Sequence, residues 1–169
     1  MEDDVKLMFG KIWPAHVGNL VDFLINCRKS CDGDLDMFLV LAVIGDQTFS
    51  QRHADENLDY KEFMSGRAED TPTVHINLRS IERFSGIPRE TARRKIDHLT
   101  KLGWVKRKSD GSLVATAKAK TDLEPLTMAS IKYIGNMMQL FNEASQFKTN
   151  SKKARNPGTR PRKQTSSRQ

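Results

Sequence analysis

The side chains best suited to chemistry in this chain are arginines that recur along one short segment, Arg89, Arg93 and Arg94, followed by Lys101. A planar guanidinium group can donate two parallel hydrogen bonds, either to a phosphate or to the O6 and N7 atoms of guanine. An amino group binds phosphate as a point charge. If a rigid element holds these groups together, they can recognise an anionic polymer.

The element that must hold them is a helix. Ala92, Ile96 and Leu99 recur at i, i+4 and i+7, so they form one apolar stripe of a helix that we expect from Pro88 to Leu102. The charged residues lie largely off this stripe and form an outward face: Arg89, Glu90, Arg93, Arg94, Asp97 and Lys101. Such a face suits the major groove of DNA, although a merely solvated amphipathic helix has the same pattern.

A shorter helix should come immediately before it. Ser80 is suited to an N-cap, which would start a helix from Ile81 to Ser85. Ile81 and Phe84, spaced i and i+3, can both face inward. Gly86 would end this helix, because glycine adopts positive φ without strain.

A hairpin should follow the second helix. Asp110-Gly111 lies between the two β-capable runs 104–108 and 113–117, and this is a strong turn signal. Lys106, Arg107 and Lys108 near its tip could hold a phosphate backbone or enter a minor groove. A third short strand is indicated by alternating apolar residues just before the first helix: Val74, Ile76 and Leu78.

The segment from Ile76 to Ala117 resembles the winged helix-turn-helix of bacterial transcription regulators. The MarR-like and GntR-like groups are nearest in pattern. The match includes Ser80-Ile81, Gly86-Ile87-Pro88-Arg89-Glu90-Thr91 and Gly103-Trp104-Val105, with Glu82 where many such units have alanine. The resemblance implies that residues 88–102 form a recognition helix, with these likeliest contacts: Arg89, Thr91, Arg93 and Arg94. It covers about 42 of the 169 residues.

The distribution of charge favours the same segment. Residues 1–75 carry 7 Lys and Arg against 14 Asp and Glu, whereas residues 76–108 carry 10 against 3. The last 22 residues carry 8 basic groups and no acidic one. Basic charge confined to one segment and a tail is typical of binding that releases counterions from nucleic acid.

The flanking segments read as helices and connections. We expect two helices within residues 1–50. Pro14 should lie in the first turn of the first helix, and residues 35–49 should form the second. Together they should form a core or a dimer interface. Residues 51–73 read as a polar connection with at most one short helix. The apolar residues of this connection are Tyr60, Phe63 and Met64. We expect them to pack onto the core, and the alternative is that they line an effector pocket.

After the hairpin, residues 119–147 should contain a helix with an apolar stripe at near-heptad spacing: Ile131, Ile134, Met138 and Phe141. This stripe indicates docking on the N-terminal helices or on a second subunit. The tail, residues 148–169, is too polar to bury a core and should be disordered. Cys27 and Cys31 read as a reduced structural pair, with a redox or metal role as the weaker alternative.

These patterns predict a mainly α fold with a small β-wing, flanked by N- and C-terminal helices. The expected function is sequence-specific binding of double-stranded DNA by a dimeric bacterial transcription regulator. A small-molecule effector is possible in principle. The expected contact residues are Ser80, Arg89, Glu90, Thr91, Arg93, Arg94, Asp97, Lys101, Lys106, Arg107 and Lys108. The alternatives are a winged protein-interaction module and an RNA-binding winged helix.

An enzyme is the weakest hypothesis, because the sequence has no Gly-rich phosphate loop, metal-ligand cluster or nucleophile elbow. We therefore expect no catalytic residue, metal or cofactor. An acidic N-terminus without a signal peptide, and apolar runs of at most 8 residues, indicate a cytoplasmic protein without a membrane span.

Overall fold

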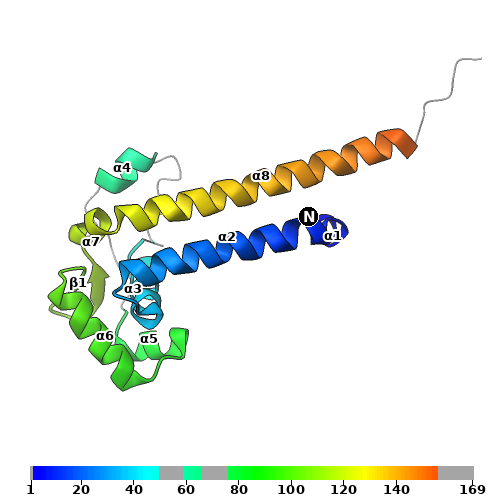
Figure 1. Cartoon of the computed structure of the whole chain (residues 1–169). Coiled ribbons are helices and arrows are strands. Elements are labelled where there is room, and N and C mark those ends of the chain that lie inside the picture. Colours follow the sequence, from blue (N-terminus) through cyan, green and yellow to red (C-terminus); the bar gives the residue numbers. More distant parts are fainter. Residues whose placement is uncertain (1, 50–58, 66–75, 156–169) are drawn as a thin grey trace, which may run out of the picture. The chain divides into compact units, whose positions relative to one another are not determined.

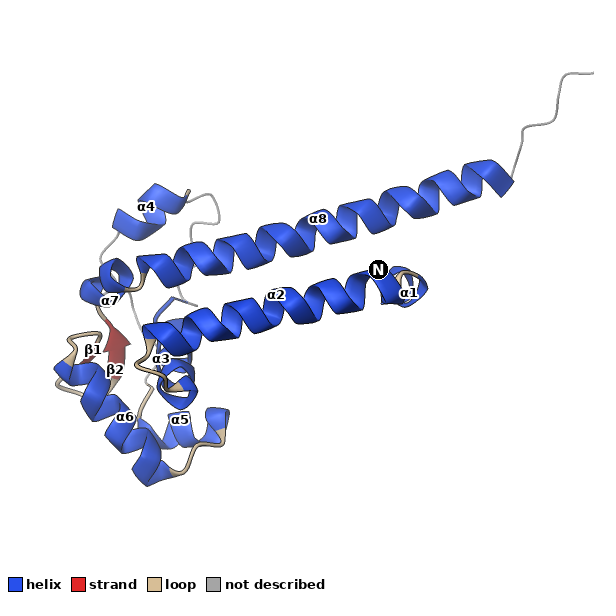
Figure 2. Ribbon diagram, in the orientation of Figure 1, coloured by secondary structure: helices blue, strands red, loops and turns tan. Residues whose placement is uncertain are grey.

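The structure is a computed structural model, and it describes residues 2–49, 59–65 and 76–155. The described residues are mainly helical, with one small antiparallel sheet (Figures 1 and 2). The helices before the sheet are α1 (Glu2–Leu7), α2 (Phe9–Ser30), α3 (Leu35–Phe49), α4 (Tyr60–Ser65), α5 (Leu78–Ser85) and α6 (Arg89–Lys101). The strands are β1 (Val105–Arg107) and β2 (Leu113–Ala115), followed by the helices α7 (Ala117–Asp122) and α8 (Glu124–Arg155).

The chain forms two compact units. The terminal unit comprises Met1–Asn19 and Tyr133–Gln169, and the central unit comprises Leu20–Lys132. Helices α2 and α8 each contribute residues to both units. The central unit contains all the elements predicted to form the reader.

In the terminal unit, polar contacts join the start of α2 to the later part of α8. The Lys11 ammonium lies 2.6 Å from a Glu143 carboxylate oxygen. The Asn136 amide donates to the Asn19 side-chain oxygen at 2.6 Å. These contacts hold the two segments antiparallel while leaving several large apolar side chains exposed on both helices.

The core of the central unit is built around α3. Asp34 caps this helix, because its carboxylate accepts a hydrogen bond from the Met37 N–H at 2.9 Å. Met37, Val40 and Ile44 are fully buried, and α3 packs against α5, α6 and β2. Leu39, on the side of α3 away from this core, remains exposed.

Helix α5 begins earlier than predicted. Its N-cap is Asn77 rather than Ser80, because the Asn77 side-chain oxygen accepts from the N–H groups of Arg79 and Ser80. Ser80 therefore lies inside the first turn. Gly86 ends the helix at φ 71°, in the left-handed region where glycine is unstrained, as predicted.

Helix α6 confirms the predicted stripe. It begins one residue after Pro88, and Ala92, Ile96 and Leu99 are buried. An ion pair between Lys95 and Asp34 joins α6 to the start of α3. The inward face of α6 is thus fixed by core packing, and its opposite face is left to solvent.

The hairpin is also present where predicted. β1 and β2 pair antiparallel with Val105 opposite Ala115 and Arg107 opposite Leu113. The third strand was predicted wrongly, because Leu78 belongs to α5. Ile76 makes one strand-like contact, its carbonyl accepting from the Leu113 N–H at 2.9 Å. Val74 lies outside the described residues.

Two helix boundaries also differ from the predictions. Pro14 lies in the second turn of α2, because the helix begins at Phe9. Helix α8 continues to Arg155, so residues 148–155, expected to be disordered, are helical. The predictions for residues 51–58, 66–73 and 156–169 lie outside the described residues.

Thr48 joins α3 to the sheet, and its removal should destabilise the central unit. Its buried hydroxyl donates to the Ile44 carbonyl at 2.7 Å and accepts from the Ala115 N–H at 3.2 Å. Thr48→Val leaves that N–H without its partner, so we expect a loss of about 1–3 kcal/mol in the free energy of unfolding, measured by urea denaturation.

Thr100→Val is the matched control. Thr100 makes the same bond to a carbonyl one turn back, that of Ile96, but it is exposed, and among the described residues no N–H donates to its hydroxyl. Equal losses from the two substitutions would contradict the role assigned to Thr48.

Candidate nucleic-acid interface

The outward face of α6 carries a chain of ion pairs. The Arg93 guanidinium donates to both Glu90 carboxylate oxygens, at 3.0 and 2.7 Å, and to Asp97 at 3.1 Å. Arg94 makes a single, longer contact of 3.3 Å with Glu90. All four side chains are at least half exposed.

This arrangement gives Arg93 and Arg94 different roles. Hydrogen bonding from Arg93, with smaller contributions from its charge and from Arg94, lowers the pKa of Glu90 to about 2. Glu90 is therefore ionised near neutral pH and offsets part of the positive charge of Arg93. Arg94, whose side chain is 75% exposed, keeps most of its donors available.

The remaining predicted residues of α6 surround this cluster. Arg89 is the first residue of the helix and is exposed, without an ion pair to any residue that the structure describes. Lys101 is exposed in the last turn, and Thr91 is half-buried. Arg89, Arg94 and Lys101 thus supply the accessible positive charge of this helix.

The hairpin offers a second basic surface in the same unit. Val105 of β1 is buried, whereas Lys106 and Arg107 are exposed and Lys108 is half-buried. The turn is held by Asp110, whose carboxylate accepts from the Ser112 N–H and hydroxyl, and by Gly111 at φ 83°. This local bonding fixes the turn that joins β1 to β2.

Trp104 anchors the base of the hairpin. Its indole N–H donates to the Asp122 carboxylate of α7 at 2.7 Å, and its ring is buried. The Thr116 hydroxyl donates to the Gly103 carbonyl at 2.6 Å, which closes the same end of the hairpin. These two hydrogen bonds therefore fix the start of β1, where the chain comes from α6.

Two basic residues on α5 were not predicted as part of the interface. Arg79 and Arg83 border a surface hollow of about 240 Å³ together with Asn77 and Ser80. Their i, i+4 spacing inside the most basic segment could have indicated them. Ser80, predicted as a contact, lies beside this hollow with its hydroxyl 3.4 Å from the Asn77 oxygen.

Phe84 does not face inward as predicted. Its side chain is 59% exposed, and the Arg83 guanidinium lies over the ring, 5.2 Å from its centroid. The core side of α5 is occupied instead by Leu78, Ile81 and the partly buried Ser85, whose hydroxyl donates to the Ile81 carbonyl. Glu82, at the position where many such helices have alanine, is also only partly buried.

No protein-family model, curated protein or solved structure matches the chain. Within the described part of the chain, no helix has the length and apolar character needed to cross a membrane.

The pairing on α6 can be tested by titration of Glu90. We expect carbon-detected NMR to give its carboxyl a pKa of about 2. Arg93→Ala should raise this pKa towards the ordinary value of about 4.3, because the largest stabilising interaction of the carboxylate is removed.

Arg94→Ala serves as the comparison, since its contact with Glu90 is longer and its influence smaller. A larger shift from Arg94→Ala than from Arg93→Ala would contradict the assigned pairing.

Proposed function

We propose that the central unit binds double-stranded DNA with sequence specificity, as a winged helix-turn-helix. The observation that carries this proposal is the two-sided character of α6. Its apolar stripe is buried against α3 and α5, Arg94 and Lys101 project from the opposite side, and Arg89 is exposed at the start of the helix. A helix held in this way can enter a major groove without disturbing the core.

The free donors of Arg94 make it the best candidate for reading a base. A guanidinium group can bond guanine O6 and N7 in bidentate fashion. Arg93 is held by Glu90 and Asp97, so its role is to position that side of the helix or to contact phosphate. Arg89 and Lys101, near opposite ends of α6, are suited to the phosphate backbone on either side.

The hairpin would then be the wing. Lys106 and Arg107 extend from β1, whose register with β2 and whose attachment through Trp104 are fixed. We assign them to the backbone or the minor groove beside the site of α6. Arg79 and Arg83 of α5, which line a surface hollow, add two further exposed basic groups to the central unit.

Binding of unpaired RNA is a second candidate, because Phe84 is exposed. An exposed aromatic ring with an arginine over it can stack on an unpaired base. Double-stranded DNA is favoured, because α6 and β1 carry several exposed basic groups, whereas the aromatic ring of Phe84 could stack on one base only.

We further propose that the protein is a homodimer joined through its terminal unit. In α8, Ile134, Met138 and Phe141 follow one another at i, i+4 and i+7 and are each at least 39% exposed. In α2, Phe9 and Trp13 are about half exposed and stack at 5.2 Å. Apolar patches of this kind mark interaction surfaces, and a two-fold dimer would match a near-palindromic site.

Arg94→Ala should weaken binding to a selected DNA site by about 1–3 kcal/mol, roughly 5- to 150-fold, if the side chain reads a base. The affinity is measured by fluorescence anisotropy at fixed salt. Lys132→Ala is the charge-matched control, because Lys132 is exposed on α8, away from α6.

An equal loss from the two substitutions would mean that Arg94 contributes only net charge. Phe84→Ala separates the two candidate functions. A large loss of affinity for single-stranded RNA, together with tighter binding of RNA than of duplex DNA, would favour the second candidate.

Met138→Glu should dissociate the dimer, because it would bury a carboxylate in an apolar interface. We expect wild-type protein to sediment with a mass near twice the 19.2 kDa of the chain, and the variant to raise the dimer dissociation constant at least about tenfold. Lys132→Glu, at an exposed position of α8 on another side of the helix from this stripe, should leave the mass unchanged. A monomeric wild-type protein at about 100 µM would contradict the proposal.

A further inference from the structure

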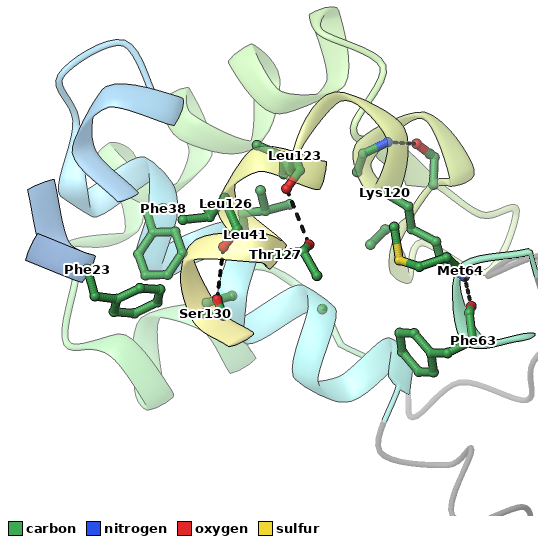
Figure 3. Close-up of a pocket in the computed structure, with 15 residues that line it drawn as sticks. Phe23, Phe38, Leu41, Phe63, Met64, Lys120, Leu123, Leu126, Thr127 and Ser130 are labelled. Atoms are coloured by element: carbon green, nitrogen blue, oxygen red, sulfur yellow. Dashed lines mark hydrogen bonds between the residues drawn. The ribbon is translucent and has the colours of Figure 1, made fainter. Parts of the chain in front are cut away.

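The central unit contains a mostly apolar cavity on the side of α3 that faces α7 and α8. Its volume is about 260 Å³, and its walls come from α2, α3, α4, β2, α7 and the start of α8. Figure 3 shows Phe23 and Phe38 at one end, Leu41 and Leu126 in the middle, and Phe63 and Met64 at the other end. Phe23 and Phe38 meet edge to face, with ring centroids 6.3 Å apart.

Two residues on the short helix α4 contribute directly to this cavity. Phe63 and Met64 line it, whereas Tyr60 is directed elsewhere and its hydroxyl bonds the Glu124 carboxylate at 3.2 Å. The prediction that these three residues simply pack onto the core is therefore incomplete. Two of them border an unfilled space large enough for a ligand.

The polar groups of the lining determine what kind of ligand fits. The Thr127 hydroxyl donates its proton to the Leu123 carbonyl at 3.2 Å, and the Ser130 hydroxyl donates to the Leu126 carbonyl at 3.0 Å (Figure 3). Each oxygen then retains only the capacity to accept. A ligand group that donates a hydrogen bond can be satisfied there.

Lys120 is the one cation among the lining residues that the structure describes, and its ammonium group already has partners. Its ammonium group donates to the Phe63 carbonyl at 2.9 Å and lies 5.1 Å from the centroid of the Phe63 ring. A ligand carboxylate would need to replace these contacts and to leave water for an apolar site, which is costly. The lining thus favours a neutral ligand over an anionic one.

We infer that this cavity binds a small neutral molecule with an aromatic or alicyclic body and one hydrogen-bond donor, such as a phenol or an alcohol. Its apolar body would lie among the phenylalanine and leucine side chains, and its hydroxyl would donate to Thr127 or Ser130. An apolar cavity of about 150 Å³ is known to admit benzene. The present volume of about 260 Å³ has room for a fused pair of rings.

The inference is tested with 2-naphthol as the neutral probe and 2-naphthoate as its anionic counterpart, using the full chain at pH 7 without nucleic acid. We expect isothermal titration calorimetry to give 2-naphthol a dissociation constant on the order of 0.1 mM, and to show binding at least about tenfold weaker for 2-naphthoate. Because no nucleic acid is present, failure of this binding is distinct from failure of the proposed DNA recognition.

Ala42→Trp should block the site. Ala42 lines the cavity but is itself exposed, so a large side chain can enter the space from its open side. We expect at least about a tenfold loss of 2-naphthol binding. Thr121→Trp is the matched control, because Thr121 is exposed on α7 and does not line the cavity.

Thr127→Val provides a second variant that does not depend on filling the cavity. It removes the acceptor oxygen and should weaken 2-naphthol binding about three- to tenfold. Absence of binding by wild-type protein, or equal binding by wild type and Ala42→Trp, would overturn the inference. Tighter binding of 2-naphthoate that is lost in Lys120→Met would overturn the neutral class and assign the site to an anion.

Discussion

The burial of one face of α3 is the constraint on which the central unit depends. Met37, Val40, Leu41 and Ile44 are almost fully removed from water, and each such side chain contributes roughly 1.5–3 kcal/mol. α5, α6 and β2 all pack against this helix. The orientation of the basic side of α6 therefore follows from packing on its opposite side. The same helix also forms a wall of the cavity between α4, α7 and α8.

The surface of α6 combines accessible and internally paired charge. Glu90 and Asp97 hold Arg93, while Arg89 and Arg94 keep donors for an external anion. Such pairs between exposed groups contribute little to stability. Their effect is geometric, because they restrict the Arg93 side chain and lower the net positive charge of the face. This moderation would favour contacts that depend on base identity over those that depend only on phosphate charge.

The sequence was most informative where a pattern is local and periodic. The buried stripe of α6, the glycine that ends α5 and the Asp-Gly turn of the hairpin all follow from neighbouring residues. Asn77 and Ser80 are both of a type suited to an N-cap, and the cap is Asn77, which follows Ile76, whose carbonyl accepts from the Leu113 N–H. Phe84 was misplaced because its apolar character fits the core, yet Leu78, Ile81 and Ser85 occupy that side. The ion pairs of Glu90 with Arg93 and Arg94 were not predicted, although their i, i+3 and i+4 spacing could have indicated them. The cavity could not be predicted, because its walls come from six elements that meet only in the folded chain.

The central claim, that the central unit reads duplex DNA, is tested most directly by selecting bound fragments from a random duplex library and sequencing them. The account predicts enrichment of one motif in two inverted half-sites with fixed spacing, near one helical turn or a multiple of it. Recovery of fragments without any shared motif, at a salt concentration where binding is still measurable, would contradict it.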